Sequence, residues 1–413
     1  MRTPQNTQPK VSKAPSLRFP EFKGEWERCK LGSLTTKVGS GSTPKGGSTV
    51  YSSDGHCFVR SQNVGMGYLI LDDIAYISND IHQKHKGTEI KDNDVLLNIT
   101  GASIGRTAIA TKDVDGGNVN QHVCIIRSNG KIDPRFLCDY IQTDKIQKYI
   151  QGLQTGGSRE GLNFEQIRSF PICLPTICEQ KKIAKLLDLI NERIATQVRI
   201  IERLETLIRG LNDYLYSLYG DGIETSFAKL GKSYSGLSGK SSEDFGVGKP
   251  FITYLNVYSN DIIDEATFQY VRLYDGEKQN VVQNGDVLFT LSSEVPEEVG
   301  VGSVYLGNQE VYLNSFCFGI HITDPAKAYS PYMSYFVSST QFRKFIYPFA
   351  QGSTRYNLCK ADFEKATLKL PILENQKRIY NVLRSLSDKI AVEEALLKQY
   401  MSQKQYLLRQ MFI

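Results

Sequence analysis

One segment of this chain occurs twice, and this repetition limits the possible folds more than any other feature of the sequence. LPTICEQKKIAKLLDLINERI covers residues 174–194, and LPILENQKRIYNVLRSLSDKI covers residues 370–390. The two copies align without a gap, so that Pro175 matches Pro371 and Gln180 matches Gln376. Because an internal repeat marks a repeated structural unit, the chain of 413 residues is predicted to consist of two related halves.

Each copy opens a long helical pattern. From Ile183 to Leu218, apolar residues recur at steps of three or four, which is the spacing of a coiled-coil helix. The same spacing runs from Ile379 to Met411, with Glu393 and Lys404 as polar interruptions. Each helix can bury its apolar stripe most simply against the other helix, in antiparallel orientation. A coiled coil between two chains is the alternative.

Shorter matches connect the globular parts of the two halves. FVRSQNV (58–64) aligns with FITYLNV (251–257), KDNDVLLNITG (91–101) resembles VQNGDVLFTLS (282–292), and VNQHVCIIRS (119–128) resembles LNSFCFGIHI (313–322). These pieces are apolar or β-branched and are bounded by Gly, Asn and Asp, as strands are. Residues 133–150 and 330–347 have helical patterns. The predicted fold class is α+β, with two globular α/β domains in pseudo-twofold arrangement, joined by two long antiparallel helices that form an intramolecular coiled coil.

The predicted organisation follows from these patterns. We expect a disordered tail at 1–16, a first globular domain at 17–175, a first long helix at 176–219, a second globular domain at 220–371 and a second long helix at 372–413. Between the matched segments, the sequences of the two halves differ almost completely. A shared scaffold with different surfaces is the pattern expected of two readers of different targets.

Composition narrows the location and the class of partner. No apolar run approaches the roughly 20 residues of a membrane helix, and residues 1–16 lack the apolar stretch of a signal peptide. The eight cysteines form no Cys-x-x-Cys pair, which is typical of reduced thiols in the cytoplasm. A net charge of +5 suits an anionic partner such as nucleic acid but does not require one. We expect a cytoplasmic protein with no membrane partner.

Motifs for catalysis are scarce. GKSS at 239–242 lacks the first glycine of a phosphate-binding loop, and GSGSTPKGG at 39–47 lacks the Gly-Lys-Ser/Thr ending. The chain has no Asn/Asp-Pro-Pro-Tyr/Phe motif, with which an amino-methyltransferase grips the amine of its base. His82 and His85 lack a third ligand that would indicate a metal site. We therefore expect no catalytic residue, no metal and no cofactor in this chain.

The duplicated Pro-x-x-x-(Glu/Asn)-Gln-Lys-(Lys/Arg)-Ile start of a long helix, placed after a variable α/β domain, resembles the specificity subunit of type I restriction–modification systems. LRFPEFKGEWERCKLGSL (17–34) is similar to the start of many such subunits. The resemblance covers the chain from about Leu17 onward. It implies two target-recognition domains, each reading one half of a split DNA sequence, and two helices that act as a ruler and as the docking surface for partner subunits.

The resemblance also implies the partners. They are double-stranded DNA, two methyltransferase subunits and two restriction or translocase subunits, and S-adenosylmethionine, ATP and Mg²⁺ would be held by the partner subunits. Two other functions stay open on the sequence alone. One is a coiled-coil adaptor with two protein-binding domains, and the other is a self-contained methyltransferase or nuclease.

Polar loops beside the expected strands supply the candidate DNA contacts. In the first half they are Lys45, Arg60, Gln62, Asn63, Ser158 and Arg159; in the second half they are Lys249, Thr253, Tyr254, Asn256, Ser353, Arg355 and Asn357. Arg159 and Arg355 precede their prolines by about the same distance, although Arg159 could be solvated beside a turn that Asn163 caps. The candidates for helix pairing and partner docking are Gln180, Lys181, Ile183, Leu187, Ile190 and Ile194, with Gln376, Lys377, Ile379, Leu383, Leu386 and Ile390 in the second copy.

Overall fold

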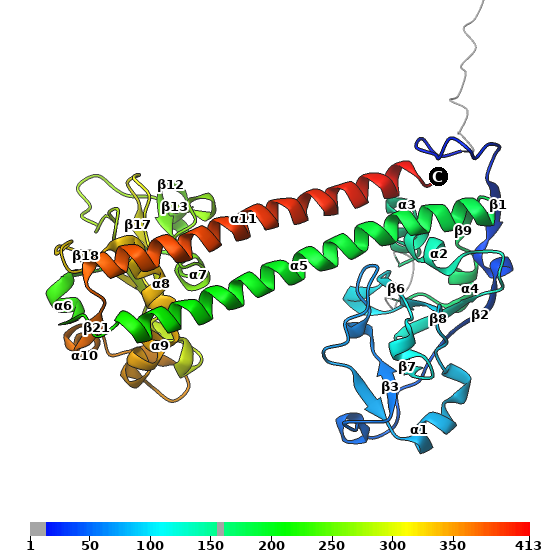
Figure 1. The fold of residues 1–413 in the computed structure, drawn as a ribbon, viewed down its shortest axis with the longest axis horizontal. Helices are drawn as coiled ribbons and strands as arrows, with labels where there is room; N and C mark the ends of the chain where they lie inside the picture. Colours follow the sequence, from blue (N-terminus) through cyan, green and yellow to red (C-terminus); the bar gives the residue numbers. More distant parts are fainter. Residues whose placement is uncertain (1–13, 155–160) are drawn as a thin grey trace, which may run out of the picture. The chain divides into compact units, whose positions relative to one another are not determined.

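The computed structural model describes residues 14–154 and 161–413. Contacts within the chain divide it into two compact units. The first unit comprises residues 1–198 and 395–413, and the second comprises residues 199–394. The chain passes from one unit to the other only inside two long helices, α5 (Ile177–Tyr219) and α11 (Leu373–Gln410), labelled in Figure 1. Each unit therefore contains one part of each long helix.

The largest sheet has the same strand order in both units. In the first unit the order is β2 (Thr35–Ser40), β8 (Val123–Ser128), β5 (Val95–Asn98), β6 (Thr107–Ile109); in the second it is β11 (Gly231–Ser235), β18 (Cys317–Ile322), β14 (Val287–Thr290), β16 (Gly302–Val304). All neighbouring strands are antiparallel. Val95 pairs with Ile126 and Val287 pairs with Ile320, so the register is repeated as well.

The smaller sheets repeat in the same way. A mixed sheet joins β4 (Ala75–Ile77), β3 (His56–Val59) and β7 (Asn118–Val119); its counterpart joins β13 (Gln269–Val271), β12 (Phe245–Ile252) and β17 (Tyr312–Leu313). A two-stranded sheet, β1 (Glu27–Lys30) with β9 (Pro171–Leu174) or β10 (Ile223–Thr225) with β21 (Leu368–Leu370), directly precedes each long helix. In the second unit, β15 (Ser292–Ser293), β20 (Tyr356–Leu358) and β19 (Ala350–Gln351) form a further sheet. Its Ser292–Asn357 pair corresponds to the antiparallel bridge between Thr100 and Gly161 in the first unit.

Short helices complete each unit. They are α1 (Asn79–Lys84), α2 (Pro134–Ile141), α3 (Asp144–Gln154) and α4 (Phe164–Arg168) in the first unit, and α6 (Phe227–Leu230), α7 (Tyr254–Ser259), α8 (Ser330–Ser338), α9 (Thr340–Ile346) and α10 (Lys360–Lys365) in the second. The helical pattern at 330–347 is split because the hydroxyl of Ser339 accepts a hydrogen bond from the backbone N–H of Phe342 at 3.1 Å and so begins a new helix. Among the described residues, no helix has the length and apolar character needed to cross a bilayer.

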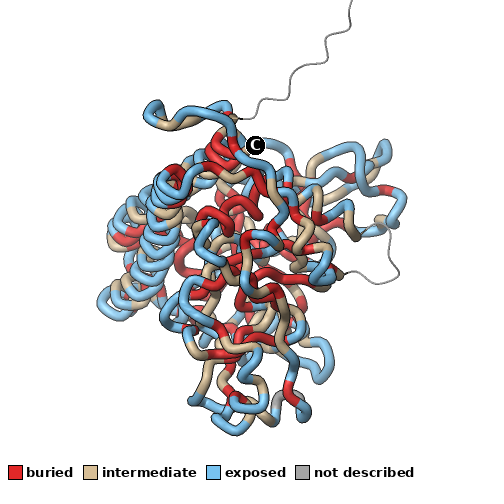
Figure 2. The backbone as a smooth tube through the Cα atoms, turned by 90° about the vertical axis from the view of Figure 1, so that its right-hand side faces the viewer, coloured by how far each residue is buried: buried red, intermediate tan, exposed pale blue. Residues whose placement is uncertain are grey.

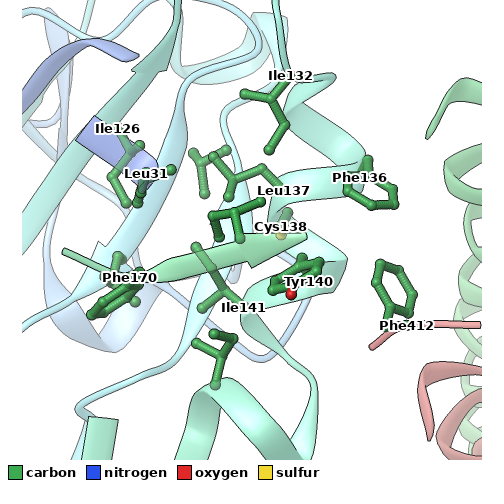
Figure 3. Packing of buried hydrophobic residues seen from close by; sticks show 14 of the residues in the cluster. Leu31, Ile126, Ile132, Phe136, Leu137, Cys138, Tyr140, Ile141, Phe170 and Phe412 are labelled. Atoms are coloured by element: carbon green, nitrogen blue, oxygen red, sulfur yellow. The ribbon is translucent and has the colours of Figure 1, made fainter. Parts of the chain in front are cut away.

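The core of the first unit includes both long helices. Phe136 and Tyr140 of α2 pack against Phe412, with ring centroids 5.2 Å and 5.6 Å apart, as Figure 3 shows. Ile183 and Leu187 of α5 lie in the same cluster. In Figure 2 the outer turns of the long helices are mainly exposed, and buried segments fill the interior of the domain. Burial of apolar surface thus fixes the beginning of α5 and the end of α11 to the first domain.

The second unit uses an aromatic core. Phe227, Phe289, Phe318, Phe342 and Phe363 lie in contact with one another, with centroid separations between 5.1 Å and 6.3 Å. Ile379 and Leu383 of α11 are buried in this cluster, and Leu211 and Leu215 of α5 pack on it. The two units therefore share a topology but fill it with different side chains.

The apolar stripe of α5 is less regular than the predicted heptad pattern. Ile183, Leu187 and Ile190 are buried, but Val198 and Leu218 are 37% and 54% exposed. Asn212 is buried instead, and its amide donates to the carbonyl oxygen of Tyr335 at 2.7 Å. The helix packs on a globular domain, and it contacts α11 where Arg193 lies over the ring of Tyr400. The buried face therefore follows the domain surface rather than one coiled-coil seam.

A buried glutamine explains why the repeated segment opens each long helix. Gln180 Oε1 accepts from the N–H of Asp133 at 2.8 Å, and its Nε2 donates to the carbonyl oxygen of Pro175 at 2.9 Å. Gln376 Oε1 accepts from the N–H of Tyr329 at 2.8 Å, and its Nε2 donates to the carbonyl oxygens of Pro371 and Lys327. Each amide ties the first turn of its helix to the start of α2 or α8. We call this contact the glutamine clamp.

The copies differ where the chain before β1 reaches the helix. Glu179 is fully buried, and its carboxylate accepts from Arg18 Nε at 2.7 Å and from Arg18 Nη2 at 2.8 Å. Leu17 N donates to the carbonyl oxygen of Gln410 at 2.9 Å, so this segment also contacts the end of α11. The second copy has Asn375 at the place of Glu179. Asn375 has no carboxylate, so among the described residues this position of the second copy forms no ion pair with an arginine.

We predict that Gln180→Ala destabilises the first unit by about 2–3 kcal/mol, because it leaves buried backbone groups without partners. Trp26 is the only tryptophan and lies buried in the first unit, so its fluorescence during urea unfolding reports on that unit. Lys181→Ala removes an exposed side chain at the next position and should change stability by less than about 0.5 kcal/mol. Equal effects of the two substitutions would contradict the clamp.

A buried carboxyl contributes a pH dependence to the same unit. Asp139 of α2 is 3% exposed, and burial raises its pKa from 3.8 to about 8, an increase that the nearby Lys404 ammonium partly offsets. Lys404 Nζ donates to Gln142 Oε1 at 3.0 Å, which explains the polar interruption in the α11 stripe. Since the folded unit binds more protons than the unfolded chain between about pH 4 and 8, its stability falls as pH rises through that window.

We predict that Asp139→Asn removes this dependence. Relative to the wild type, the variant should gain stability between pH 5 and pH 8, on the order of 1 kcal/mol or more, because each pKa unit corresponds to about 1.4 kcal/mol. Urea unfolding followed by Trp26 fluorescence at several pH values measures the difference. A difference that stays constant with pH would show that Asp139 is ionised in the folded state throughout.

Candidate nucleic-acid interface

An asparagine of the repeat sets a tight turn before β8 and before β18. Asn120 Oδ1 accepts from the N–H of His122 at 3.0 Å, and Asn314 Oδ1 accepts from the N–H of Phe316 at 2.9 Å. The carbonyl oxygens of His122 and Phe316 then accept from Ile99 N and Leu291 N, at 3.0 Å and 2.9 Å. His122 and Phe316 therefore occupy equivalent positions at the same edge of the two repeated sheets.

In the first unit, polar side chains gather at this edge in what we call the Gln121 cluster, made up of Thr43, Thr100, Gln121 and His122. Thr43 Oγ1 contacts Gln121 Oε1, Gln121 Nε2 lies 3.0 Å from His122 Nε2, and His122 Nδ1 lies 2.6 Å from Thr100 Oγ1. The four side chains form one continuous hydrogen-bonded chain, and the Gln121 side chain is exposed.

The loop after β2 reaches this cluster through a glycine. A Cβ on Gly41 would lie 1.6 Å from the carbonyl oxygen of Val119, and Gly41 N donates to the carbonyl oxygen of Asn120 at 3.1 Å. Only glycine fits at such a close approach of two backbones. Lys45 is exposed in the same loop, two residues after Thr43. Lys45, one of the predicted DNA contacts, therefore belongs to the same loop as Thr43 of the Gln121 cluster.

The second unit has an aromatic and cationic set at the equivalent edge, which we call the Arg355 cluster: Tyr254, Ser292, Phe316 and Arg355. Arg355 Nε and Nη2 donate to Ser292 Oγ at 3.3 Å and 3.2 Å, and the guanidinium carbon lies 5.8 Å from the ring centroid of Phe316. Tyr254 Oη donates to the carbonyl oxygen of Ser292 at 2.8 Å, and burial raises the pKa of this phenol. Phe316 is 56% exposed.

Two further predicted residues lie beside the Arg355 cluster. Asn357 pairs with Ser292 in the sheet of β15 and β20, and its side chain is exposed. Ser353 is exposed in the loop between β19 and β20. Tyr254, Ser353, Arg355 and Asn357 are therefore gathered in one region of the second unit.

Other predicted residues hold the fold. Arg60 pairs with Asp73 at 3.1 Å and lies over the ring of Tyr51, and Gln62 donates to the same Asp73 carboxylate. Asn63 is 1% exposed and donates to the carbonyl oxygens of Ile70 and Asp73. These contacts engage all three side chains within the first unit. Of the three, only Gln62 is exposed to solvent.

The corresponding residues of the second unit are also engaged. Thr253 Oγ1 accepts from Asn256 N at 3.1 Å and begins α7. Asn256 is 3% exposed and donates to the carbonyl oxygen of Asp264 at 2.8 Å, whereas Lys249 is exposed and lies 3.3 Å from Glu310. Asn63 and Asn256 match in the aligned segments, so the repeat preserves a buried amide here rather than a contact to a ligand.

Ser158 and Arg159 lie outside the described residues. After that segment, the amide of Asn163 accepts from Gln166 N at 2.8 Å, and Gln166 Oε1 accepts from Asn163 N at 2.9 Å. This capping box at the start of α4 is the one that the sequence suggested.

The residues proposed for helix pairing and docking divide by exposure. The glutamines of the clamp, Gln180 and Gln376, are buried, as are Ile183, Leu187, Ile190, Ile379 and Leu383; Ile194, Leu386 and Ile390 are half-buried, and Lys181 and Lys377 are exposed. Most of this set therefore supports the units from within. Only the two lysines present a full side chain to solvent.

Sequence reasoning missed Thr43, Thr100, Gln121, His122, Ser292 and Phe316. A signal was present in the alignment of VNQH with LNSF, where the asparagines match and the next two residues differ in chemistry. A variable pair in the matched turn before a strand indicates a position whose backbone is fixed by the fold while its side chain is free to change. The contacts to Thr43 and Ser292 join segments far apart in the chain and could not be read from local patterns.

A family model described as the type I restriction modification DNA specificity domain matches residues 23–206 and again residues 232–399. The two matches cover most of the chain and coincide with the repeated topology. The chain belongs to the family of type I restriction–modification specificity subunits. The predicted family and fold class are confirmed.

Individual relatives support this membership. A type I restriction enzyme specificity subunit of Methanocaldococcus jannaschii, MjaX, is 23% identical over 412 residues, which cover 90% of this chain and 89% of the relative. The EcoBI specificity subunit of Escherichia coli is 29% identical over 133 residues, and that match covers 32% of this chain and only 28% of the relative.

Solved structures share the fold. The crystal structure of a type I restriction–modification S subunit from M. genitalium has a TM-score of 0.56 at 14% identity, covering 97% of this chain and 99% of that one. A chain from a structural study of complex assembly and conformational transition in a type I R-M system has a TM-score of 0.57 at 17% identity, covering 93% and 96%. At this identity the likeness concerns the fold alone.

Proposed function

We propose that this chain is the subunit that gives a type I restriction–modification complex its DNA sequence specificity, with one domain reading each half of an asymmetric, two-part target. The observation that carries the proposal is the pair of clusters at equivalent sheet edges. At equivalent sheet edges, the first unit presents a hydrogen-bonded set that contains one amide, Gln121, and the second unit presents an arginine–aromatic set. Different side chains at equivalent sheet edges imply different half-sites, because base identity is read by side-chain chemistry.

We propose further that the chain is not itself an enzyme. Its relatives are named as specificity subunits. The chain lacks the Asn/Asp-Pro-Pro-Tyr/Phe motif of amino-methyltransferases and the complete phosphate loop of an ATPase. S-adenosylmethionine, ATP and Mg²⁺ are then bound by the partner subunits, and the complex works in the cytoplasm on double-stranded DNA.

Methyltransferase subunits need a surface on which to dock, and α5 offers one in the second unit. Ile200, Leu207, Tyr214 and Leu218 recur at steps of seven, seven and four along one face of the helix, and they are 36%, 50%, 58% and 54% exposed. An exposed apolar stripe of this kind is typical of a protein-binding surface. We assign it to a methyltransferase subunit, two of which would join the chain, followed by two restriction subunits.

Methylation profiling tests the function. Host DNA is sequenced for modified adenine with this gene present, deleted, and present without its partner genes. We expect a split motif, with two unlike blocks around unread base pairs, that disappears in both deletions. A contiguous palindrome, or methylation by the purified chain alone with methyl donor, would contradict the proposal. Binding that does not weaken with salt would favour a protein-binding adaptor instead, because phosphate contacts make DNA affinity salt-dependent.

The helices as a ruler give a second prediction. Seven residues inserted after Val198 in α5, together with seven after Glu394 in α11, add two turns to both helices at the points where the chain passes between units. Seven residues lengthen a helix by about 10 Å, which corresponds to roughly three base pairs of DNA. We expect the unread spacer to grow by about that amount while both blocks stay the same. A change inside a block would show that the helices also take part in base reading.

A further inference from the structure

We infer that Gln121 and Arg355 are the base-reading side chains of the two units, and that Gln121 reads an adenine and Arg355 a guanine. The inference rests on the proposed DNA function. It goes beyond that function by naming the residues, the bases and the reason why each side chain is suited to its base. In both clusters, neighbouring groups hold the reading side chain before DNA arrives.

The hydrogen-bonded chain in the first unit orients the amide of Gln121. Its Oε1 accepts from the hydroxyl of Thr43, and its Nε2 donates to His122 Nε2 at 3.0 Å. His122 Nδ1–H then donates to Thr100 Oγ1 at 2.6 Å. The amide oxygen keeps one lone pair, and the amide nitrogen keeps one hydrogen.

These two free groups match adenine. In the major groove adenine presents its N7 acceptor and its N6 amino donor, which a glutamine amide contacts in a bidentate manner. The supporting bonds from Thr43 and His122 reduce the rotamer freedom that Gln121 would otherwise lose on binding. A phosphate offers acceptors only and would leave the free lone pair of Oε1 without a partner, so this exposed and oriented amide favours a base contact.

Ser292 and Phe316 orient the guanidinium of Arg355. The Nε and Nη2 groups both point at Ser292 Oγ, at 3.3 Å and 3.2 Å, and the plane lies over the exposed ring of Phe316. Those bonds leave the Nη1 hydrogens and one Nη2 hydrogen free. Two parallel N–H groups at the end of an arginine match O6 and N7 of guanine.

The equivalence of the two edges decides between a base contact and a phosphate contact for Arg355. Each cluster is built beside an asparagine-set turn, on Thr100 or its counterpart Ser292, and beside His122 or its counterpart Phe316. The first of these sites carries a neutral reader. A shared location on a shared scaffold therefore assigns the same task, base reading, to the charged residue of the second site.

The test uses the chain in complex with its methyltransferase subunits, after the wild-type target has been determined by methylation profiling. Gln121→Glu keeps the shape but replaces the amide donor with an acceptor. Arg355→Lys keeps the charge but loses the paired N–H groups. Competition binding to duplexes with every base substituted in turn measures the preference at each position, and each lost bidentate contact should reduce discrimination by roughly 5- to 150-fold.

We expect Gln121→Glu to lose preference for an adenine in one half-site only, and Arg355→Lys to lose preference for a guanine in the other half-site only. Gln83→Glu in α1 and Arg378→Lys in α11 make the same chemical changes at exposed positions and should leave all preferences unchanged. Thr43→Val and Ser292→Ala remove only the orienting hydroxyls and should give weaker changes at the same bases. If Gln121→Glu or Arg355→Lys fails to assemble with the methyltransferase subunits, the base preferences of Thr43→Val and Ser292→Ala still test the inference.

Uniform weakening at every base, with a smaller salt dependence, would overturn the inference for Arg355 in favour of a phosphate contact. Unchanged base preferences in both reading variants would overturn it entirely and leave the proposed function intact. A wild-type complex without any sequence preference would instead refute the proposed function. Duplexes with 7-deazaguanine at the assigned guanine remove the N7 acceptor, and wild type and Arg355→Lys should bind them with similar affinity.

Discussion

A single buried amide at the first turn of each long helix joins the globular domain to the helix that follows it. Gln180 and Gln376 each bond the proline that precedes the helix and the backbone at the start of the neighbouring α2 or α8. A helix can be displaced by rotation or by sliding on an apolar core, but the directed hydrogen bonds of the clamp permit one orientation. The direction in which each helix leaves its domain depends on this clamp.

The repeat made the architecture predictable, because both copies of the clamp motif, their prolines and their apolar spacing are visible in the sequence. The ends of α5 and α11 lie within three residues of the predicted bounds for the same reason. The precise buried face of α5 was not predictable. Asn212 is buried because the backbone of Tyr335 accepts its hydrogen bond, and that partner is 123 positions away in the chain.

The candidate site was predictable only in part. Tyr254 and Arg355 were found from loop composition and do lie together, but Asn63 and Asn256, chosen on the same grounds, are buried amides that close turns. Composition cannot distinguish a polar side chain that satisfies the fold from one that faces a ligand, since both sit in loops beside strands. The distinction depends on burial and on partners, as the contrast between Asn256 and Arg355 in one unit illustrates.

The hydrogen bond from Leu17 N to the carbonyl oxygen of Gln410 brings a segment near the beginning of the described residues and the end of α11 together in the first unit. The path of the described backbone is therefore nearly circular, and its two ends lie close together in the first unit. If a short linker joined these neighbouring points and new termini were cut at the exposed turn around Asp221, every clamp and both cores would keep their residues. The fold would then not require the polypeptide to start at its present N-terminus.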